Sequence, residues 1–131
     1  MSPQPAKRLY IRTFGCQMNE HDSERIRAIL ACEGYADALS PCDADLILFN
    51  TCTIRAKSHH KAISEIGRAR VYKENRPRTI VGVCGCVAQE EGASLFERYP
   101  HIDIMFGPDQ IPRLAELLAE AAAGRRAAAL D

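Results

Sequence analysis

The chain lacks tryptophan, a net charge and any long hydrophobic run. The last two absences limit the classes of protein to which it can belong. Acidic and basic residues balance at 17 each, so the overall charge favours neither a polyanionic nor a polycationic partner. No stretch stays apolar for long enough to cross a membrane or to act as a secretory signal. With 131 residues, the chain is long enough for one hydrophobic core. We therefore expect one cytoplasmic domain in a reducing compartment, without membrane contact.

What the chain does have is six cysteines. In a reducing compartment a disulfide framework is not expected, so metal binding or thiol chemistry is the better interpretation. Structural zinc sites usually draw their ligands as close pairs, but no Cys-x-x-Cys occurs here. The only close pair is Cys84-Gly85-Cys86.

Short apolar runs alternate with helical patterns along the chain. This alternation predicts an α/β fold: a doubly wound parallel sheet with helices on both faces, in three αβα layers. Five strands favour the flavodoxin-like order 2-1-3-4-5. The expected strands are 8–14, 35–39, 44–50, 79–85 and 102–106, and the expected helices are 22 or 23 to 34, 56–75, 89–98 and one from 108. Residues 1–7 are expected to be a disordered tail, 8–121 the domain and 122–131 a linker, with Gly124 ending the last helix.

Three cysteines follow three of these strands. Cys16 comes after the first, Cys52 after the third and Cys86 after the fourth. In the proposed order these strands are neighbours about 4.8 Å apart, so their carboxyl ends span only about 10 Å. Three thiols from separate loops suit a polynuclear iron–sulfur cluster, in which one iron would keep no protein ligand. The plain alternative is that they are buried cysteines of the core.

The other cysteines receive simpler interpretations. Cys84 precedes Cys86 by two residues and should still lie within the strand, so we take Cys86 as the ligand and Cys84 as a packed thiol or the alternative ligand. Cys32 is interpreted as a buried filler in mid-helix and Cys42 as a surface thiol in a polar turn.

Glycine and amide side chains flank the candidate ligands. Gly15 and Gly85 precede them directly, and glycine allows close backbone approach to a bulky cofactor. Gln17, Asn19 and Asn50 could donate hydrogen bonds to cluster sulfur and tune its potential. Turn chemistry explains the asparagines equally well.

Positive charge is concentrated between residues 55 and 78, where eight Lys or Arg residues accompany only two Glu. This bias predicts a nucleic-acid surface, for which we select Arg55, Lys57, Arg68 and Arg70. A solvated helix face explains the same pattern.

The motifs TFGCQMNEHDS, NTCTIRAKS and GVCGCVAQEEG, followed by DIMFGP, resemble the N-terminal domain of radical-SAM methylthiotransferases. They are most similar to the tRNA-modifying branch, the MiaB type, because GCQMNEHDSE accompanies NTCTIR. The resemblance covers residues 9–118.

The resemblance implies that Cys16, Cys52 and Cys86 hold an auxiliary 4Fe-4S cluster whose remaining iron carries or delivers sulfur. It implies methylthiolation of N6-isopentenyladenosine at position 37 of tRNA. Cys84 departs from the pattern, which has a small non-cysteine residue there. The Cys-x3-Cys-x2-Cys motif for a second 4Fe-4S cluster and S-adenosylmethionine is absent, as is a C-terminal RNA-binding domain. We therefore expect this chain to work with those two domains and to be inactive alone.

Other functions are compatible with an α/β fold that carries several cysteines. A flavodoxin-like flavin binder would want hydroxyl groups in the loop after the first strand, where this chain has Cys-Gln-Met-Asn-Glu. A cysteine phosphatase would want an arginine six residues after its nucleophile, but Asp22, Ser58 and Gly92 stand there. An interaction domain that uses the basic stretch, or a methylthiotransferase with another substrate, are further alternatives.

Overall fold

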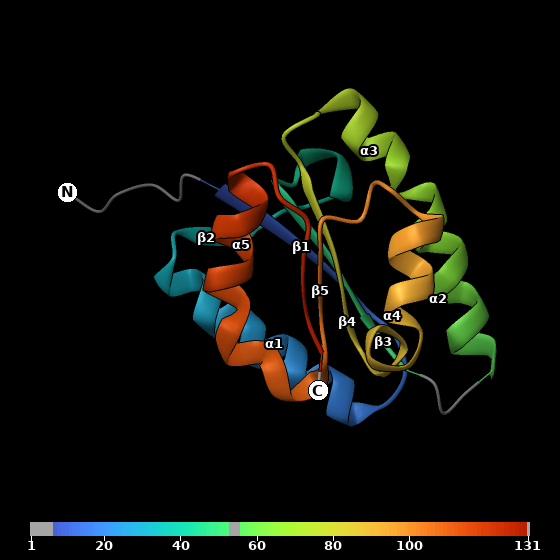
Figure 1. Cartoon of the computed structure of the whole chain (residues 1–131). Helices are drawn as coiled ribbons and strands as arrows, with labels where there is room; N and C mark the ends of the chain where they lie inside the picture. Colours follow the sequence, from blue (N-terminus) through green and yellow to red (C-terminus); the bar gives the residue numbers. More distant parts are fainter. Residues whose placement is uncertain (1–6, 53–55, 131) are drawn as a thin grey trace.

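The fold is a parallel sheet in the strand order β2-β1-β3-β4-β5-β6 (Figure 1). The structure, a computed structural model, describes residues 7–52 and 56–130. Its strands are β1 (Lys7–Thr13), β2 (Tyr35–Asp37), β3 (Leu46–Thr51), β4 (Ile80–Gly85), β5 (Ile104–Phe106) and β6 (Ala127–Ala129). The helices are α1 (Gln17–Cys32), α2 (Ala56–Arg68), α3 (Arg70–Asn75), α4 (Cys86–Arg98) and α5 (Leu114–Ala122), with 3-10 turns at Pro41–Asp43 and Pro108–Arg113. The α/β class and the order of the first five strands are confirmed.

The prediction of five strands is wrong, because a sixth strand forms within the stretch interpreted as a linker. β6 pairs with β5 in parallel, with Ile104 opposite Ala127. The Arg126 side chain secures this strand, since it donates to the carbonyl oxygens of Phe96 at 2.7 Å and Ile102 at 2.8 Å. An alanine run has little strand propensity of its own, so tertiary contacts decide its conformation. Gly124 does follow the end of α5, in a left-handed conformation with φ 86°.

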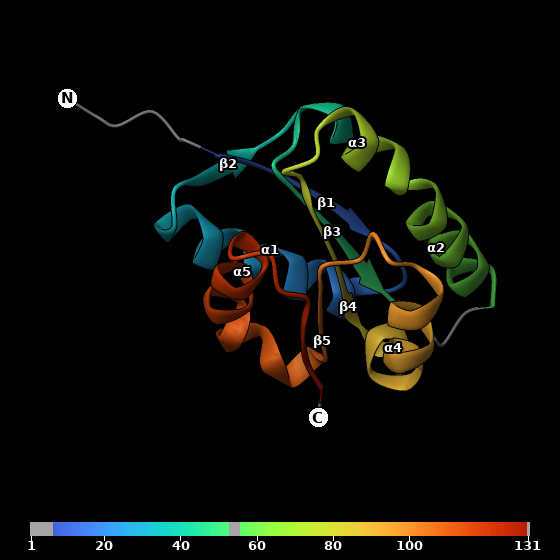
Figure 2. The ribbon, with the colours of Figure 1, turned by 45° about the horizontal axis from the view of Figure 1, so that its top comes forward.

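Helices cover both faces of the sheet and create two hydrophobic cores. Helices α1 and α5 lie on one face, while α2, α3 and α4 lie on the other (Figures 1 and 2). Every residue of β3 is buried, as expected for a central strand of a parallel sheet. Leu46 and Leu48 face the α1/α5 core, whereas Ile47 and Phe49 face the other core. The predicted three-layer αβα arrangement is therefore confirmed.

Helix α1 begins at Gln17, five or six residues earlier than predicted, because neither Asp22 nor Ser23 caps it. Cys16 occupies the N-cap position, and its backbone N–H donates to Oδ1 of Asn19 at 3.4 Å. Ser23 is fully buried and shares a hydrogen bond of 2.8 Å with Thr13. Its hydroxyl thus joins α1 to β1 instead of capping the helix.

Two further helices differ from the prediction. The single helix expected over 56–75 is divided at Ala69 into α2 and α3. Helix α4 begins at Cys86, three residues before the predicted start, because Gly85 turns the chain with φ 89°. Cys86 therefore opens a helix and does not lie on a loop.

Candidate cysteine site at the carboxyl edge of the sheet

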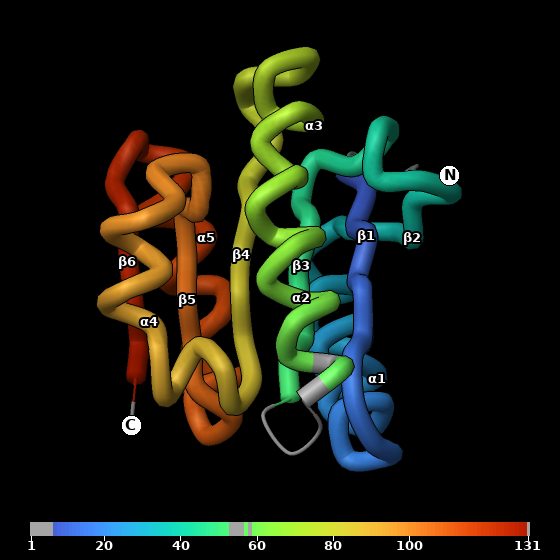
Figure 3. The backbone as a smooth tube through the Cα atoms, turned by 90° about the vertical axis from the view of Figure 1, so that its right-hand side faces the viewer, coloured from blue at the N-terminus to red at the C-terminus, as the bar shows by residue number. Residues whose placement is uncertain are grey.

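Three cysteines lie at one edge of the sheet, where β1, β3 and β4 end. Cys16 caps α1 just after β1, Cys52 directly follows β3, and Cys86 is the first residue of α4. The strands that precede them are adjacent in the sheet, and their carboxyl ends form the lower edge in Figure 3. The predicted placement of these cysteines at one edge is confirmed; their role as ligands stays a prediction.

The turn before Cys16 packs directly against Cys52. Gly15 has φ 102°, and a Cβ added to it would lie 2.4 Å from Cβ and 2.9 Å from Sγ of Cys52. Since real Cβ atoms do not approach so closely, only glycine allows this contact. Gly15 therefore brings the loops that carry Cys16 and Cys52 together.

Buried hydrogen bonds of Asn19 in α1 and Asn50 in β3 join the two segments that carry Cys16 and Cys52. The Nδ2 of Asn19 donates to the Thr51 carbonyl oxygen at 2.9 Å and to Oδ1 of Asn50 at 3.2 Å. The Nδ2 of Asn50 donates to the Asn19 carbonyl oxygen at 2.7 Å and to Ser23 Oγ at 2.9 Å. All four amide hydrogens are thus engaged within the protein. Gln17, the third predicted amide, is exposed on the first turn of α1.

Thr51 fixes the start of α4 and hence Cys86. Its hydroxyl donates to the Cys84 carbonyl oxygen at 2.5 Å and accepts from the Val87 N–H at 3.2 Å. Gly85 again needs its lack of a side chain, because a Cβ there would lie 2.4 Å from the Thr51 carbonyl oxygen. Sequence reasoning missed Thr51, although a polar residue at the end of an otherwise apolar strand was a usable signal.

The two close cysteines differ sharply in environment. Cys84 is 2% exposed and belongs to the α1/α5 core. Burial raises the pKa of its thiol strongly, and the negative charge of Asp22 adds to this effect. Cys52 is equally buried but belongs to neither hydrophobic core. Cys86 is partly exposed at the helix start, which favours it as the ligand.

Cys32 and Cys42 take no part in this site. Both are exposed, so the surface interpretation of Cys42 is confirmed and the filler interpretation of Cys32 is wrong. Cys32 is the last residue of α1 rather than a mid-helix residue. None of the six cysteines, all of which lie in the described residues, forms a disulfide bond.

The thiols of Cys16, Cys52 and Cys86 have the donor chemistry of an iron–sulfur cluster but do not form a preformed metal site. As the side chains stand, no three His, Cys, Asp or Glu residues in 7–52 and 56–130 form a group that could hold a metal ion. The thiols therefore share an edge without forming a finished ligand set. They do provide the soft donors that such clusters use. Helices α1 and α4, of 16 and 13 residues, also begin at this edge, and their dipoles favour an anionic group there. The thiols fit such a cluster in donor chemistry, and the strand ends that carry them share one edge of the sheet.

A pair of side chains joins α2 to α4, the helices that follow Cys52 and begin with Cys86. His59 Nε2 lies 2.5 Å from Oε2 of Glu91. Sequence reasoning gave this pair no role, because its partners are 32 residues apart and only the packing of the two helices brings them together.

The predicted nucleic-acid residues are solvent-facing where the structure describes them. Lys57 and Arg68 lie on α2 and Arg70 begins α3; all three are exposed. Within the described ranges, none of these three cations pairs with a carboxylate. Arg55 lies outside the described residues. Unpaired surface cations are suited to phosphate contacts.

None of the helices in the described part of the chain is long and apolar enough to span a membrane.

The sequence matches a known protein family and is similar to curated proteins. Residues 8–107 match the model of the Uncharacterized protein family UPF0004. The chain belongs to the UPF0004 family. This UPF0004 chain is 48% identical over 122 residues to the tRNA-2-methylthio-N(6)-dimethylallyladenosine synthase of Burkholderia ambifaria (strain MC40-6), an alignment that covers 92% of the chain and 27% of that relative. It is 49% identical over 115 residues to the protein of the same name from Thiobacillus denitrificans (strain ATCC 25259 / T1), with 87% and 26% covered. The resemblance to methylthiotransferases of the tRNA-modifying branch is thereby confirmed. The UPF0004 chain spans about a quarter of the length of these curated relatives.

Proposed function

We propose that this chain is the auxiliary-cluster domain of a cytoplasmic tRNA methylthiotransferase. In the whole protein it acts with a radical-SAM domain, which supplies a second 4Fe-4S cluster and S-adenosylmethionine, and with an RNA-binding domain. The substrate is N6-isopentenyladenosine at position 37 of tRNA, which is converted to its 2-methylthio derivative. The relatives carry a name for this reaction.

Cys16, Cys52 and Cys86 are the residues that hold the 4Fe-4S cluster. When bound, such a cluster supplies an iron without a protein ligand, at which sulfur for insertion can be carried. The observation that carries the proposal is the placement of three cysteines at three adjacent strand ends, with Gly15 packed against Cys52. Thiols contributed singly by three separate segments suit a cluster better than a single metal ion.

The remaining residues of the site position these thiols. Asn19 and Asn50 brace the Cys16 turn against β3, and Thr51 braces the start of α4. A site built on rigid elements keeps its ligands in one geometry. Cys84 lies within β4 and packs in the α1/α5 core, so we assign it no ligand role.

Quantification of iron and sulfide after anaerobic reconstitution tests this proposal. Wild type should be brown, and Cys16→Ala, Cys52→Ala and Cys86→Ala should each lose most of their iron. Cys84→Ala should keep it, as should Cys32→Ala and Cys42→Ala, which change exposed thiols and serve as matched controls. Retention of iron by Cys16→Ala and Cys52→Ala would contradict the cluster. Loss by Cys84→Ala alone would reverse the choice between Cys84 and Cys86, and a yellow protein would indicate flavin.

We also propose that the exposed cations of α2 and α3 contact tRNA. In the full-length enzyme, Arg68→Glu and Arg70→Glu should weaken tRNA binding and reduce the slope of log affinity against log salt by about 0.7–0.9 per lost phosphate contact. Unchanged affinity and slope would refute this surface and leave the cluster proposal intact.

A further inference from the structure

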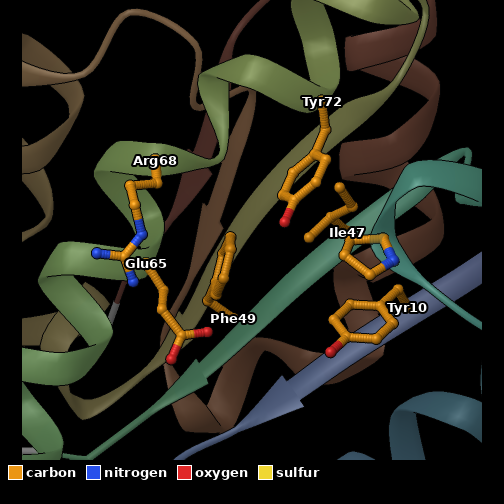
Figure 4. A pocket seen from close by; sticks show the side chains of 7 residues that line it. Tyr10, Ile47, Phe49, Glu65, Arg68 and Tyr72 are labelled. Carbon is orange, nitrogen blue, oxygen red and sulfur yellow. The ribbon is translucent and has the colours of Figure 1, made fainter.

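A small cavity lies on the α2/α3 face of the sheet, away from the cysteine edge (Figure 4). Its volume is about 120 Å³. Tyr10 of β1 and Phe49 of β3 come from the sheet, while Glu65 and Arg68 of α2 and Tyr72 of α3 come from the helices above it. Figure 4 shows the three aromatic rings around one space, with Arg68 beside Glu65. Pro41 and Ile47 complete the lining. A mainly apolar and aromatic lining with two charged groups is the composition of a ligand site rather than of a core gap.

The aromatic rings are available to a ligand. Phe49 is buried, but Tyr10 and Tyr72 are each half-buried. Neither tyrosine hydroxyl has a hydrogen-bond partner in the part of the chain that the structure describes. Tyrosines of this kind present an apolar face and a polar tip to whatever enters the cavity.

The charges around the cavity favour an anionic ligand with a neutral, planar part. Both carboxylate oxygens of Glu65 accept from Arg12, at 3.0 and 3.2 Å. The ion pair neutralises Glu65 without using every lone pair of its oxygens. Arg68 has no carboxylate partner among the described residues and stays exposed. The cavity therefore offers a neutralised acceptor inside and an uncompensated cation at its rim.

Further cations continue from this rim along α2. Lys57, Lys61 and Arg68 are exposed at a spacing of four and seven residues, which places them on one side of the helix. At a rise of about 1.5 Å per residue, they extend over roughly 16 Å. A row of this length suits the phosphates of a polynucleotide rather than a single anion.

We propose that this cavity receives one unstacked nucleobase of a single-stranded RNA segment, whose phosphates lie along Lys57, Lys61 and Arg68. The base stacks on the rings of Tyr10 and Tyr72, as unstacked RNA bases do on aromatic side chains. An exocyclic amino group of the base donates to Glu65. This inference rests on the proposed action on tRNA, and it adds a second point of RNA contact outside the cysteine edge.

Fluorescence anisotropy with a labelled oligoadenylate of twelve nucleotides tests the inference on this chain. Tyr72→Leu removes the stacking ring and should weaken binding about fivefold or more. Tyr72→Phe keeps the ring and should bind as wild type does. Tyr99→Leu is the matched control. Like Tyr72, Tyr99 is partly buried against the hydrophobic core that contains Phe49, but it lies outside the cavity. If Tyr72→Leu and Tyr99→Leu lose the same amount of affinity for oligoadenylate, the loss comes from disturbed packing and the inference is overturned.

A polyanion without bases separates stacking from charge. Inorganic polyphosphate of twelve units should bind wild type and Tyr72→Leu equally, whereas Lys61→Ala with Arg68→Ala should weaken both probes. If Tyr72→Leu leaves oligoadenylate binding unchanged while the charge variants weaken it, the base pocket is wrong and the RNA surface stands. If wild type binds no oligoadenylate but assembles iron as proposed, the pocket is overturned and the cluster function survives.

Discussion

Asn19 and Asn50 hold each other in place between α1 and β3. Asn50 Nδ2 donates to the Asn19 carbonyl oxygen at 2.7 Å, while Asn19 Nδ2 donates to Asn50 Oδ1 at 3.2 Å. Both side chains are buried, and no buried side-chain nitrogen or oxygen in the described residues lacks a partner. Because Asn19 also accepts from the Cys16 backbone N–H, this exchange joins the Cys16 turn to the strand that leads to Cys52.

Asn50→Asp should destabilise the protein strongly. The substitution removes both donors and places a carboxylate against the Asn19 carbonyl oxygen. A buried group left without its partner costs about 1–3 kcal/mol, so the free energy of unfolding should fall by ~2 kcal/mol or more. Urea unfolding at pH 7 measures this change. Asn75→Asp makes the same substitution at the exposed end of α3 and should stay within about 0.5 kcal/mol of wild type. Equal effects of the two variants would show that Asn50 is not a brace.

Gly15→Ala should destabilise the protein more than Gly34→Ala. Both glycines have positive φ, 102° and 89°, so alanine at either site bears a backbone cost of about 1–2 kcal/mol. Only at Gly15 does the new Cβ meet other atoms, since nothing lies within 4 Å of a Cβ at Gly34. Chemical denaturation of the two variants measures the difference. Gly15→Ala should also displace Cys52 and lower the iron bound after reconstitution; the same loss in Gly34→Ala would contradict this explanation.

Thiol alkylation should separate Cys84 from the surface cysteines. Burial, together with the charge of Asp22, raises the pKa of Cys84, so iodoacetamide should reach it only when the protein unfolds. Cys32 and Cys42 are exposed and should react quickly in the folded protein. Peptide mass spectrometry gives the rate at each site. If Cys84 reacts in the folded protein as quickly as Cys32, Cys84 is more accessible than the structure indicates.

His101 should make the stability depend on pH. Burial lowers its pKa, and the charges of Lys73 and Arg70 act in the same direction against the opposing effects of Asp103 and the Ile66 carbonyl oxygen. The unfolded chain, whose histidine pKa is about 6.5, therefore binds the proton more readily than the native protein. The free energy of unfolding should fall as the pH drops through 6.5, until the native histidine is protonated too. His101→Gln should remove part of this slope between pH 7 and pH 5, whereas His60→Gln, at an exposed position, should not. Identical slopes for the two variants would rule out His101 as the cause.

Much of the fold could be predicted because local pattern and tertiary structure agree in the central strands. The apolar runs of β3 and β4 could only be buried on both faces, and parallel strands with helical crossovers follow from that. The prediction failed for β6, whose residues are all alanine; a partner strand and the Arg126 side chain stabilise it. It also failed at the start of α1, where Ser23 has the right chemistry for a cap but forms its hydrogen bonds with Thr13 and Asn50.

The positions of the candidate ligands could be predicted, but the support around them could not. Cys16, Cys52 and Cys86 follow strands, and strand ends can be read from the sequence. The bracing depends on register, which places Asn50 beside Cys84 and Thr51 beside Gly85. That register follows from the packing of whole helices on the sheet, and no local pattern encodes it. Two of the three amides predicted to face a cofactor, Asn19 and Asn50, therefore face each other.

The direction of β6 has a practical consequence for how this chain can be tethered. β1 begins at the edge of the sheet opposite the cysteines, whereas β6 runs parallel to it and ends at the cysteine edge (Figure 3). A fluorophore, surface linker or fused protein attached after Leu130 would thus be held close to the thiols at a high effective concentration. The same group attached before Lys7 would be separated from them by the length of the sheet. Immobilisation through the N-terminal side should therefore leave the cysteine edge open to a partner in solution.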